Sequence, residues 1–475
     1  GSMICLPKLF SGHLSGRVRK ILSAAALALV IGLGVYVRLG GIAGATSWNP
    51  DEVNIRHWMK MHQGGAGFPA VYPGGFFVMS RPAKTFFEKR IRGPLWHVGF
   101  RCGLTDVEYP PRGMEFRLWG ILFSLLLAAL SIWLAHSLAR VVTGSYLGAL
   151  AGAIAFAFHP IFVEHSHYLE TDIAMLFCAM LTLRLMAWYS HTPGFVALAL
   201  TALASGFAFG VKYTNIALLP TLLLTLFTTH VTRTFLETKS RTETSARFSG
   251  FSVLLKKALW TRRSLWLSFL AVIVLFLLGS ALATPRAGSP NRERNSTSVN
   301  ASAEQSPQKV PGALNESASR FVKVTNHLRR ESQGLTADSD PMTARVVLVM
   351  RAFWGSFTAP GALWTLGVVV GLLALAFQRR FLPFLPLALG YPLAYGCMIF
   401  LVAPWFRTQE ILPLLPFFSL AYAALVAWAI DFPSLKDTKS RYAWWFRGIG
   451  SFAVLVATVF SLACAWRRAT DLDEV

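Results

Sequence analysis

Charged residues are scarce in this 475-residue chain, at 14% of the sequence, whereas 54% of its residues are hydrophobic. Soluble domains usually carry about a quarter charged residues, so the composition argues against a soluble globular protein and indicates a polytopic membrane protein. Cysteine is scarce too. The five cysteines are scattered and no Cys-x-x-Cys spacing occurs, which argues against a disulfide framework and against a cysteine metal site.

Acidic residues are few beside basic ones, 23 against 45, and the formal net charge is +22. In a soluble protein this excess would suggest nucleic acid. In a membrane protein it follows from basic cytoplasmic loops and from contact with anionic lipid headgroups. We therefore expect the lipid bilayer as a partner and no nucleic acid. The opening Gly-Ser-Met has the look of an expression-tag remnant and is set aside.

Apolar runs of about 20 residues, within a working range of about 17–25, are long enough to cross the hydrocarbon of a bilayer. We predict about eleven such spans. They lie near residues 21–40, 116–139, 144–160, 170–189, 195–211, 213–229, 264–283, 360–378, 381–402, 410–430 and 448–466. Only helices and closed barrels satisfy the backbone in lipid, and these runs are too long and non-alternating for barrel strands. The predicted fold class is therefore all-α, a polytopic integral membrane bundle.

The charges that flank these runs predict their orientation. Residues 1–20 carry four basic residues before the first run, which places the N-terminus in the cytoplasm. Alternation then puts the basic segments 230–263 and 431–447 inside as well, in agreement with the positive-inside rule. The first run is longer than the apolar core of a signal peptide, so we expect it to be retained as a span.

We divide the chain into a cytoplasmic N-terminus, a transmembrane module over residues 21–430, and a segment over 431–475 that holds a cytoplasmic stretch, the last span and an outer tail. Two long segments of the module face out. Residues 41–115 are rich in Trp and Phe and are expected to be ordered and helical, whereas residues 284–343 are rich in Ser and Asn and read as largely disordered in their first half.

Adjacent carboxylates, Asp51 and Glu52, follow the first predicted span. Such a pair is costly so close to a membrane unless a substrate, a cation or water requires it. The alternative is a helix start, because Pro50 suits a first helical position and acidic residues favour the first turn. A helix start needs only one carboxylate, so Asp51 is a candidate functional residue.

The predicted outer loop 159–172 contains three His, two Glu and one Asp. His165 and His167, with Glu164 or Asp172, could ligate zinc or manganese, although the spacing matches no dedicated zinc motif. The alternative is a polar helix cap, in which Asp172 serves as the N-cap of the next span. Asp172 also enters the membrane boundary, where an ionisable residue indicates function by default.

Two cations lie at the same predicted face of the membrane. Lys212 separates two apolar runs that are joined by almost no loop, and Arg407 precedes a later span. Each could anchor a phosphate, the lysine as a point charge and the arginine bidentately. The alternatives are a snorkelling lysine and an interfacial arginine paired with Glu410. Cations beside carboxylates suggest an anionic lipid-linked donor next to a proton acceptor.

These motifs, in this order, resemble those of the membrane GT-C glycosyltransferases, nearest to the protein O-mannosyltransferase and lipid A aminoarabinose transferase group. They are the acidic pair after the first span, the second acid after a His/Tyr-rich loop, Gly-x-Lys-Tyr-Thr at residues 210–214, and an Arg followed by Leu-Pro-Leu-Leu-Pro. The resemblance covers roughly residues 20–430 and implies a GT-C-like bundle with a long helical first outer loop. The number of spans predicted for this chain is lower than the number in the aminoarabinose transferases.

The resemblance implies an inverting transfer of one sugar from a polyprenyl-phosphate donor to an acceptor on the non-cytoplasmic face. Asp51 would be the general base, and Asp172 would position the acceptor or a polar network. Lys212 and Arg407 would hold the donor phosphate. Further substrate contacts are expected from Glu52, Tyr72, Arg81, Lys84 and His167. The protein, lipid or glycan that serves as acceptor is not indicated.

A transporter or flippase of lipid-linked or anionic cargo is the alternative, because intramembrane charges are expected in that class too. No inverted repeat is visible and the charges fall on one face rather than at the midplane, which favours the transferase. We expect no required cofactor. His165 and His167 would point about 200° apart on a helix and to opposite sides of a strand, and two cations can offset a monophosphate. A bound but non-essential divalent ion is compatible with this expectation.

Overall fold

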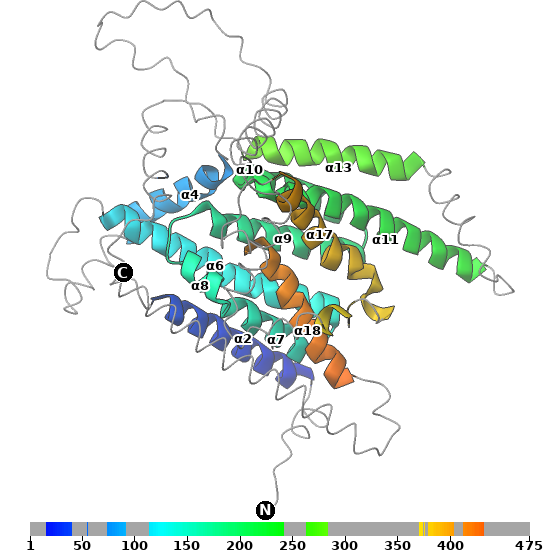
Figure 1. Ribbon diagram of the computed structural model, residues 1–475, viewed down its shortest axis with the longest axis horizontal. Coiled ribbons are helices and arrows are strands. Elements are labelled where there is room, and N and C mark those ends of the chain that lie inside the picture. The colour runs from blue at the N-terminus through cyan, green and yellow to red at the C-terminus, as the bar shows by residue number, and fades with distance from the viewer. Residues whose placement is uncertain are drawn as a thin grey trace, which may run out of the picture.

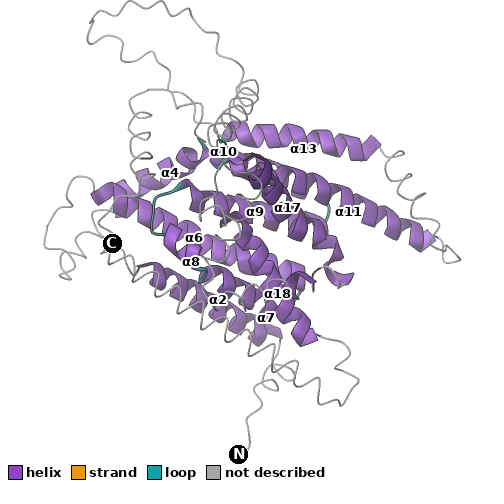
Figure 2. Ribbon diagram, viewed as in Figure 1, coloured by secondary structure: helices purple, strands orange, loops and turns teal. Residues whose placement is uncertain are grey.

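The computed structural model describes residues 16–39, 55, 74–91, 114–241, 263–283, 370–373, 375, 379–402 and 412–431. Within these ranges the chain consists of helices and short connections and contains no strand (Figure 2). This confirms the predicted all-α class. In the predicted first outer loop, residues 75–91 are helical and Ile55 is fully buried in the core.

Helices and short helical turns make up the described chain (Figure 1). They are α2 (Gly16–Leu39), α4 (Gly75–Phe86), the π-helical turn η1 (Phe87–Ile91), α6 (Met114–Thr143), α7 (Tyr146–Ala157), α8 (Pro160–His165), α9 (Thr171–His191), α10 (Phe195–Val211), the 3-10 turn η2 (Tyr213–Ala217), α11 (Leu218–Arg241), α13 (Arg263–Leu282), the 3-10 turn η4 (Arg379–Phe384), α17 (Leu385–Val402) and α18 (Leu415–Asp431).

Six of the described helices are long and apolar enough to cross a membrane, and α7 and α10 are shorter apolar helices. The chain is thus a multi-pass membrane protein, as predicted. The total of about eleven spans stays a prediction, because residues 448–466 and most of 360–378 lie outside the described residues.

Two helices end away from the predicted limits of their spans. The run predicted to span 144–160 ends as α7 at Ala157, because Pro160 has no N–H to continue that helix and instead begins the short helix α8. Residues 160–165 are therefore helical rather than loop. At the other boundary, α11 continues to Arg241, so the predicted cytoplasmic loop 230–263 begins within a helix.

Helix α9 lies at the centre of the bundle, in contact with α6, α10 and α11, and most of its residues are buried. Beside it, α10 and α13 pack backbone to backbone. A Cβ atom on Gly206 would overlap the carbonyl of Phe276, and one on Gly279 would overlap the carbonyl of Leu203. Small residues at such positions let membrane helices approach closely where lipid gives little hydrophobic driving force.

The ends of α2 and α10 lie beside the starts of α6 and α9, toward the left of Figure 1. We call this the Asp172 end of the bundle; it is the end predicted to face out. Helix α4 lies across it, against α6, α9 and α10. A Cβ on Gly75 would come within 2.7 Å of the Gly210 carbonyl oxygen, so the start of α4 is seated directly on the end of α10.

Candidate active site

The start of α9 places a carboxylate inside the protein. Glu170 precedes the helix in an extended conformation and Asp172 occupies the first turn. An acidic side chain is favoured there by the positive end of the helix dipole. Asp172 is nevertheless only 2% exposed, so a dipole contribution alone does not account for its burial, and a buried carboxylate requires a partner.

The end of α10 supplies that partner. Lys212 leaves the helix in an extended conformation and η2 follows at once. Asn215, in η2, is fully buried, and its amide Nδ2 donates to the carbonyls of Ala208 (3.0 Å) and Met175 (3.3 Å). Because Met175 lies one turn beyond Asp172, the asparagine fixes the α10–η2 corner against the first turns of α9.

Lys212 Nζ forms an ion pair with Asp172 Oδ1. The Asp172 side chain is 3% exposed and that of Lys212 is 17% exposed, so the lysine is the member of the pair that solvent reaches. An ammonium group has three N–H donors, and Asp172 Oδ1 accepts one of them. The arrangement presents an oriented cation at the end of the bundle, backed by a buried carboxylate.

A second buried ion pair lies just before α9. His165 Nδ1 is 2.9 Å from Glu170 Oε2, and both side chains are buried. Burial lowers the pKa of the His165 imidazole, whereas the hydrogen bond and charge of Glu170 raise it. Asp172 and Glu164 add to the rise, and the net pKa of His165 is raised. The imidazole therefore favours its charged form, with Nδ1–H donating to Glu170.

The rest of the segment between α7 and α9 is held from several sides. His167 Nδ1 donates to the Val163 carbonyl at 2.8 Å, and the His167 side chain is buried. The Ser124 hydroxyl of α6 donates to the Tyr168 carbonyl at 2.9 Å. His159 is buried and stacks on Phe418 of α18, and burial lowers its pKa to about 3, which keeps this imidazole neutral.

Arg38, at the end of α2, is a residue that the sequence reasoning missed. Its side chain is fully buried, Nε donates to Ser166 Oγ at 3.1 Å, and Nη1 donates to the Gly34 carbonyl at 2.8 Å. The guanidinium also lies over the Phe162 ring, with its carbon 4.3 Å from the ring centroid. The signal in the sequence was weak, because an arginine near the end of an apolar span usually snorkels to the membrane surface.

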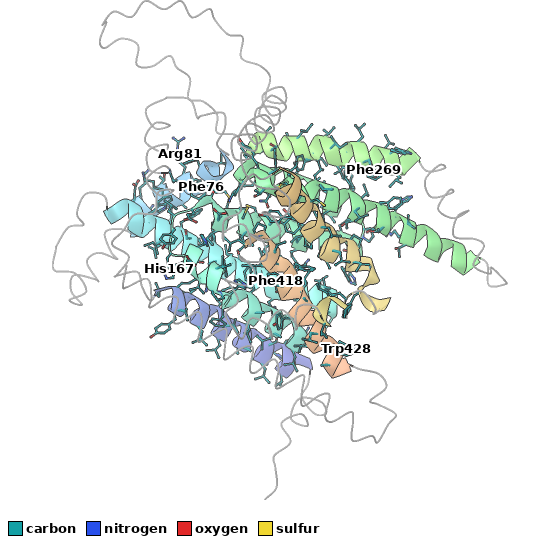
Figure 3. All side chains as sticks on the ribbon, in the orientation of Figure 1. Phe76, Arg81, His167, Phe269, Phe418 and Trp428 are labelled. Carbon is teal, nitrogen blue, oxygen red and sulfur yellow. The ribbon has the colours of Figure 1, made fainter. Side chains whose placement is uncertain are left out.

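Several predicted site residues lie elsewhere or outside the described part. Arg81 is exposed on the outer side of α4, whereas Phe76 is buried beneath that helix (Figure 3). Lys84 Nζ lies 3.6 Å from Glu88 Oε1, in an ion pair between residues one helical turn apart. The remaining predicted positions are outside the described residues: Asp51, Glu52, Tyr72 and Arg407. Of the nine predicted positions, the structure brings together Asp172 and Lys212.

The described residues contain no group of three His, Cys, Asp or Glu side chains that could hold a metal ion. His165 and His167, the predicted candidates, are bound to different partners, a carboxylate and a backbone carbonyl.

Residues 114–260 match the family model for dolichyl-phosphate-mannose-protein mannosyltransferase. That stretch contains both ion pairs, Asp172–Lys212 and His165–Glu170. No curated protein matches the sequence significantly.

Solved structures resemble the fold at low sequence identity. The Archaeoglobus fulgidus oligosaccharyltransferase, tethered with an acceptor peptide containing the NVT sequon, matches with a TM-score of 0.50 and 12% identity, over 96% of this chain and 56% of that one. ArnT from Cupriavidus metallidurans, bound to undecaprenyl phosphate, matches with a TM-score of 0.47 and 15% identity, over 97% and 76%. The chain spans a little over half the length of the oligosaccharyltransferase, 56%, and the likeness is one of fold.

Proposed function

We propose, from the premise that this chain is a polytopic membrane protein with the GT-C fold that its motifs predicted, that it transfers a single sugar from a polyprenyl-phosphate donor to an acceptor at the non-cytoplasmic face. The observation that carries the proposal is the Asp172–Lys212 pair at the Asp172 end of the bundle. It lies within the stretch matched by a family named for a dolichyl-phosphate sugar.

Lys212 is the proposed anchor for the donor phosphate. A lysine ammonium is a compact point charge that commonly binds phosphate, and this one is oriented by Asp172 while its side chain stays partly exposed. Its place at the end of α10 suits a phosphate carried at the membrane surface. We propose Arg407 as the second cation on the phosphate.

Asp172 acts in this proposal through Lys212 rather than on the substrate. Its carboxylate is 3% exposed and bound to the lysine, and the neighbouring Asn215 fixes the corner that carries Lys212. Among the two roles that the family resemblance implied for Asp172, the polar network is the one this geometry supports. A fixed cation loses little entropy when a phosphate binds, because its position is already determined.

The proposed chemistry is a single displacement. The acceptor hydroxyl or amine attacks the anomeric carbon, the new glycosidic bond forms, and the bond from that carbon to the phosphate oxygen breaks. The lipid phosphate leaves with the electron pair, and Lys212 and Arg407 stabilise its charge. Asp51 takes the acceptor's proton as general base. One displacement inverts the anomeric configuration.

We assign further donor contacts to the first outer segment and propose that no divalent metal is needed. Arg81 is exposed on α4 and available to an anionic group, and Lys84 lies one helical turn further on. Glu52 and Tyr72 complete the set, and buried His167 would act by fixing the segment before α9. A lipid monophosphate carries less charge than a diphosphate, so two cationic side chains can offset it without an ion.

The test is transfer by the purified protein in liposomes, with a panel of radiolabelled polyprenyl-phosphate sugars and membrane extract as the source of acceptor. We expect label to move from the lipid fraction to an acceptor with one of the sugars, and to move far more slowly with Lys212→Ala. Label that crosses the bilayer while still lipid-linked would identify a flippase. Label that does neither, with every donor, would overturn the proposal.

A further inference from the structure

Arg38 has the largest side chain among the fully buried residues of the described chain. It lies at the end of a helix that otherwise reads as an apolar span. No ion pair to Arg38 occurs within the described residues; its partners are a hydroxyl, a carbonyl and an aromatic ring. One guanidinium nitrogen, Nη2, is buried without a hydrogen-bond partner there.

Burying an arginine only to fill space would lower the stability of the folded protein. A buried charge loses its hydration, and replacing it with an apolar side chain of similar volume is often neutral or stabilising. Ionisable residues within membrane spans are correspondingly rare and are usually functional. The charge at Arg38 therefore points to a role for the side chain, and the described bonds show what it holds.

Arg38 holds the segment that leads into α9. Its Nε donates to Ser166 Oγ, and the Ser166 hydroxyl in turn donates to the Phe162 carbonyl. The guanidinium also covers the Phe162 ring. Phe162 and Ser166 lie in and just after α8. Four residues after Ser166, Glu170 binds His165 and ends the segment immediately before α9.

We infer that Arg38 is a positioning residue for the proposed reaction: it clamps residues 160–170 onto α2 and thereby fixes Asp172, which orients Lys212. Arginine suits this task because its planar fork donates in fixed directions and its face stacks on an aromatic ring. Lysine can reproduce the charge but not this geometry. The catalytic part of the inference rests on the proposed function, whereas the clamp itself does not.

Arg184 provides a matched control. Its Nε donates to Ser137 Oγ at 2.7 Å, which links α9 to α6 by the same pair of groups that links Arg38 to Ser166. Arg184 lies more than three turns along α9 from Asp172, and its hydrogen bond within the described part of the chain goes to α6 rather than to residues 160–170. An arginine–serine bond is thus common to both sites, but only the bond of Arg38 reaches the segment between α7 and α9.

The first experiment is amide hydrogen exchange in nanodiscs, followed over peptides that cover residues 163–168, whose amides bond within the segment. Arg38→Met should raise the exchange rate there by about tenfold or more, the loss expected for a charge-assisted bond, and Ser166→Ala should raise it less. Arg184→Met should leave it unchanged. If Arg38→Met fails to fold, Ser166→Ala carries this test. Unchanged exchange in Ser166→Ala and in a folded Arg38→Met would overturn the clamp.

The second experiment asks whether Arg38 acts through Asp172. Arg38→Met should lower kcat by about tenfold or more in the parent background, and Arg38→Lys should not restore it. In an Asp172→Asn background Arg38→Met should add less than about twofold, because the residue it positions has already been lost. Equal factors in both backgrounds would show a merely structural role and overturn the inference. If wild-type protein transfers no sugar, the proposed function fails while the exchange measurement still decides the clamp.

Discussion

The two connections that flank α9 differ in what they do with polar residues. Before α9, residues 158–170 bury His165, His167 and Glu170 in bonds with one another and with backbone. After α9, residues 192–194 leave their polar groups largely in solvent, and the Thr192 hydroxyl simply bonds back to the Trp188 carbonyl. Polar residues near a membrane surface are inexpensive when exposed. The side chains that mark a functional end are those that the fold buries and pairs.

If the active site lies at the Asp172 end of the bundle, Asp51→Asn should cause the largest loss of transfer rate. Removing a general base while keeping its shape costs about 10²–10⁴-fold in rate, and donor binding should change little. His191→Asn, at the exposed end of α9, is the matched control and should retain the parent rate. Steady-state transfer kinetics measure both, and an Asp51→Asn enzyme within a few-fold of the parent would end the assignment of the base.

A smaller effect is expected from the phosphate contacts. Lys212→Ala and Arg407→Ala should each weaken donor binding by roughly tenfold or more, because a charge-assisted hydrogen bond contributes about 1.5–3 kcal/mol. Lys20→Ala, at the exposed start of α2 and the far end of the bundle, should have no effect on donor affinity. Titration of polyprenyl phosphate into protein in nanodiscs gives the dissociation constants.

The same two positions can test which side of the membrane the proposed donor site faces. Lys212→Cys and Arg407→Cys should react with an impermeant thiol reagent added to intact cells. Labelling only after the membrane is made permeable would show that both positions face the cytoplasm. They could then not belong to an outer donor site, whatever their effect on affinity.

The buried pair before α9 should make stability depend on pH. The folded-state pKa of His165 is raised, mainly by Glu170 against the effect of burial. The pair's stabilisation is therefore fully present below the ordinary histidine pKa of about 6.5 and is lost as pH rises through the folded pKa. The difference in Tm between the parent and His165→Gln should be largest under mildly acidic conditions and shrink above the folded pKa. Glu170→Gln should remove this pH dependence; a difference that grows with pH would contradict the account.

No effect is expected from removing divalent metal. Activity should survive exhaustive EDTA treatment and should not rise with added Mn²⁺, Mg²⁺ or Zn²⁺, because the cations proposed for the phosphate are side chains. Loss of activity with chelator and its return with one of these metals would make the segment before α9 a candidate metal site and require a new role for Asp172.

Much of the fold could be predicted because span length is set by the bilayer. The ends of α9 and α10 fell within about two residues of their predicted positions, a usual margin for helix boundaries. The end of α7 did not, because the predicted run was continued through Phe158 to Pro160, whereas the helix cannot pass the proline. Hydropathy reports burial in lipid and is insensitive to missing backbone donors.

The candidate site was predicted in its residues but not in its contacts. Asp172 was predicted to position the acceptor or a polar network and Lys212 to hold the donor phosphate, without a contact between them, although α9 and α10 are joined by only residues 192–194 and are of similar length. Such a hairpin brings the start of one helix beside the end of the other, so the pairing could have been inferred from the link. The bond of Arg38 to Ser166 could not, because it joins residues 128 positions apart in the chain and depends on how α2 packs.

The most direct test of the account is to locate the bound lipid. A polyprenyl phosphate that carries a photoreactive group beside the phosphate should crosslink, in the protein embedded in a bilayer, to peptides at the start of α9 and the end of α10, around Asp172 and Lys212. Unmodified polyprenyl phosphate in excess should abolish this labelling, and Lys212→Ala should reduce it. Specific labelling confined to the opposite connection, residues 192–194 and the adjoining helix ends, would contradict the central claim that the buried Asp172–Lys212 pair marks the donor site.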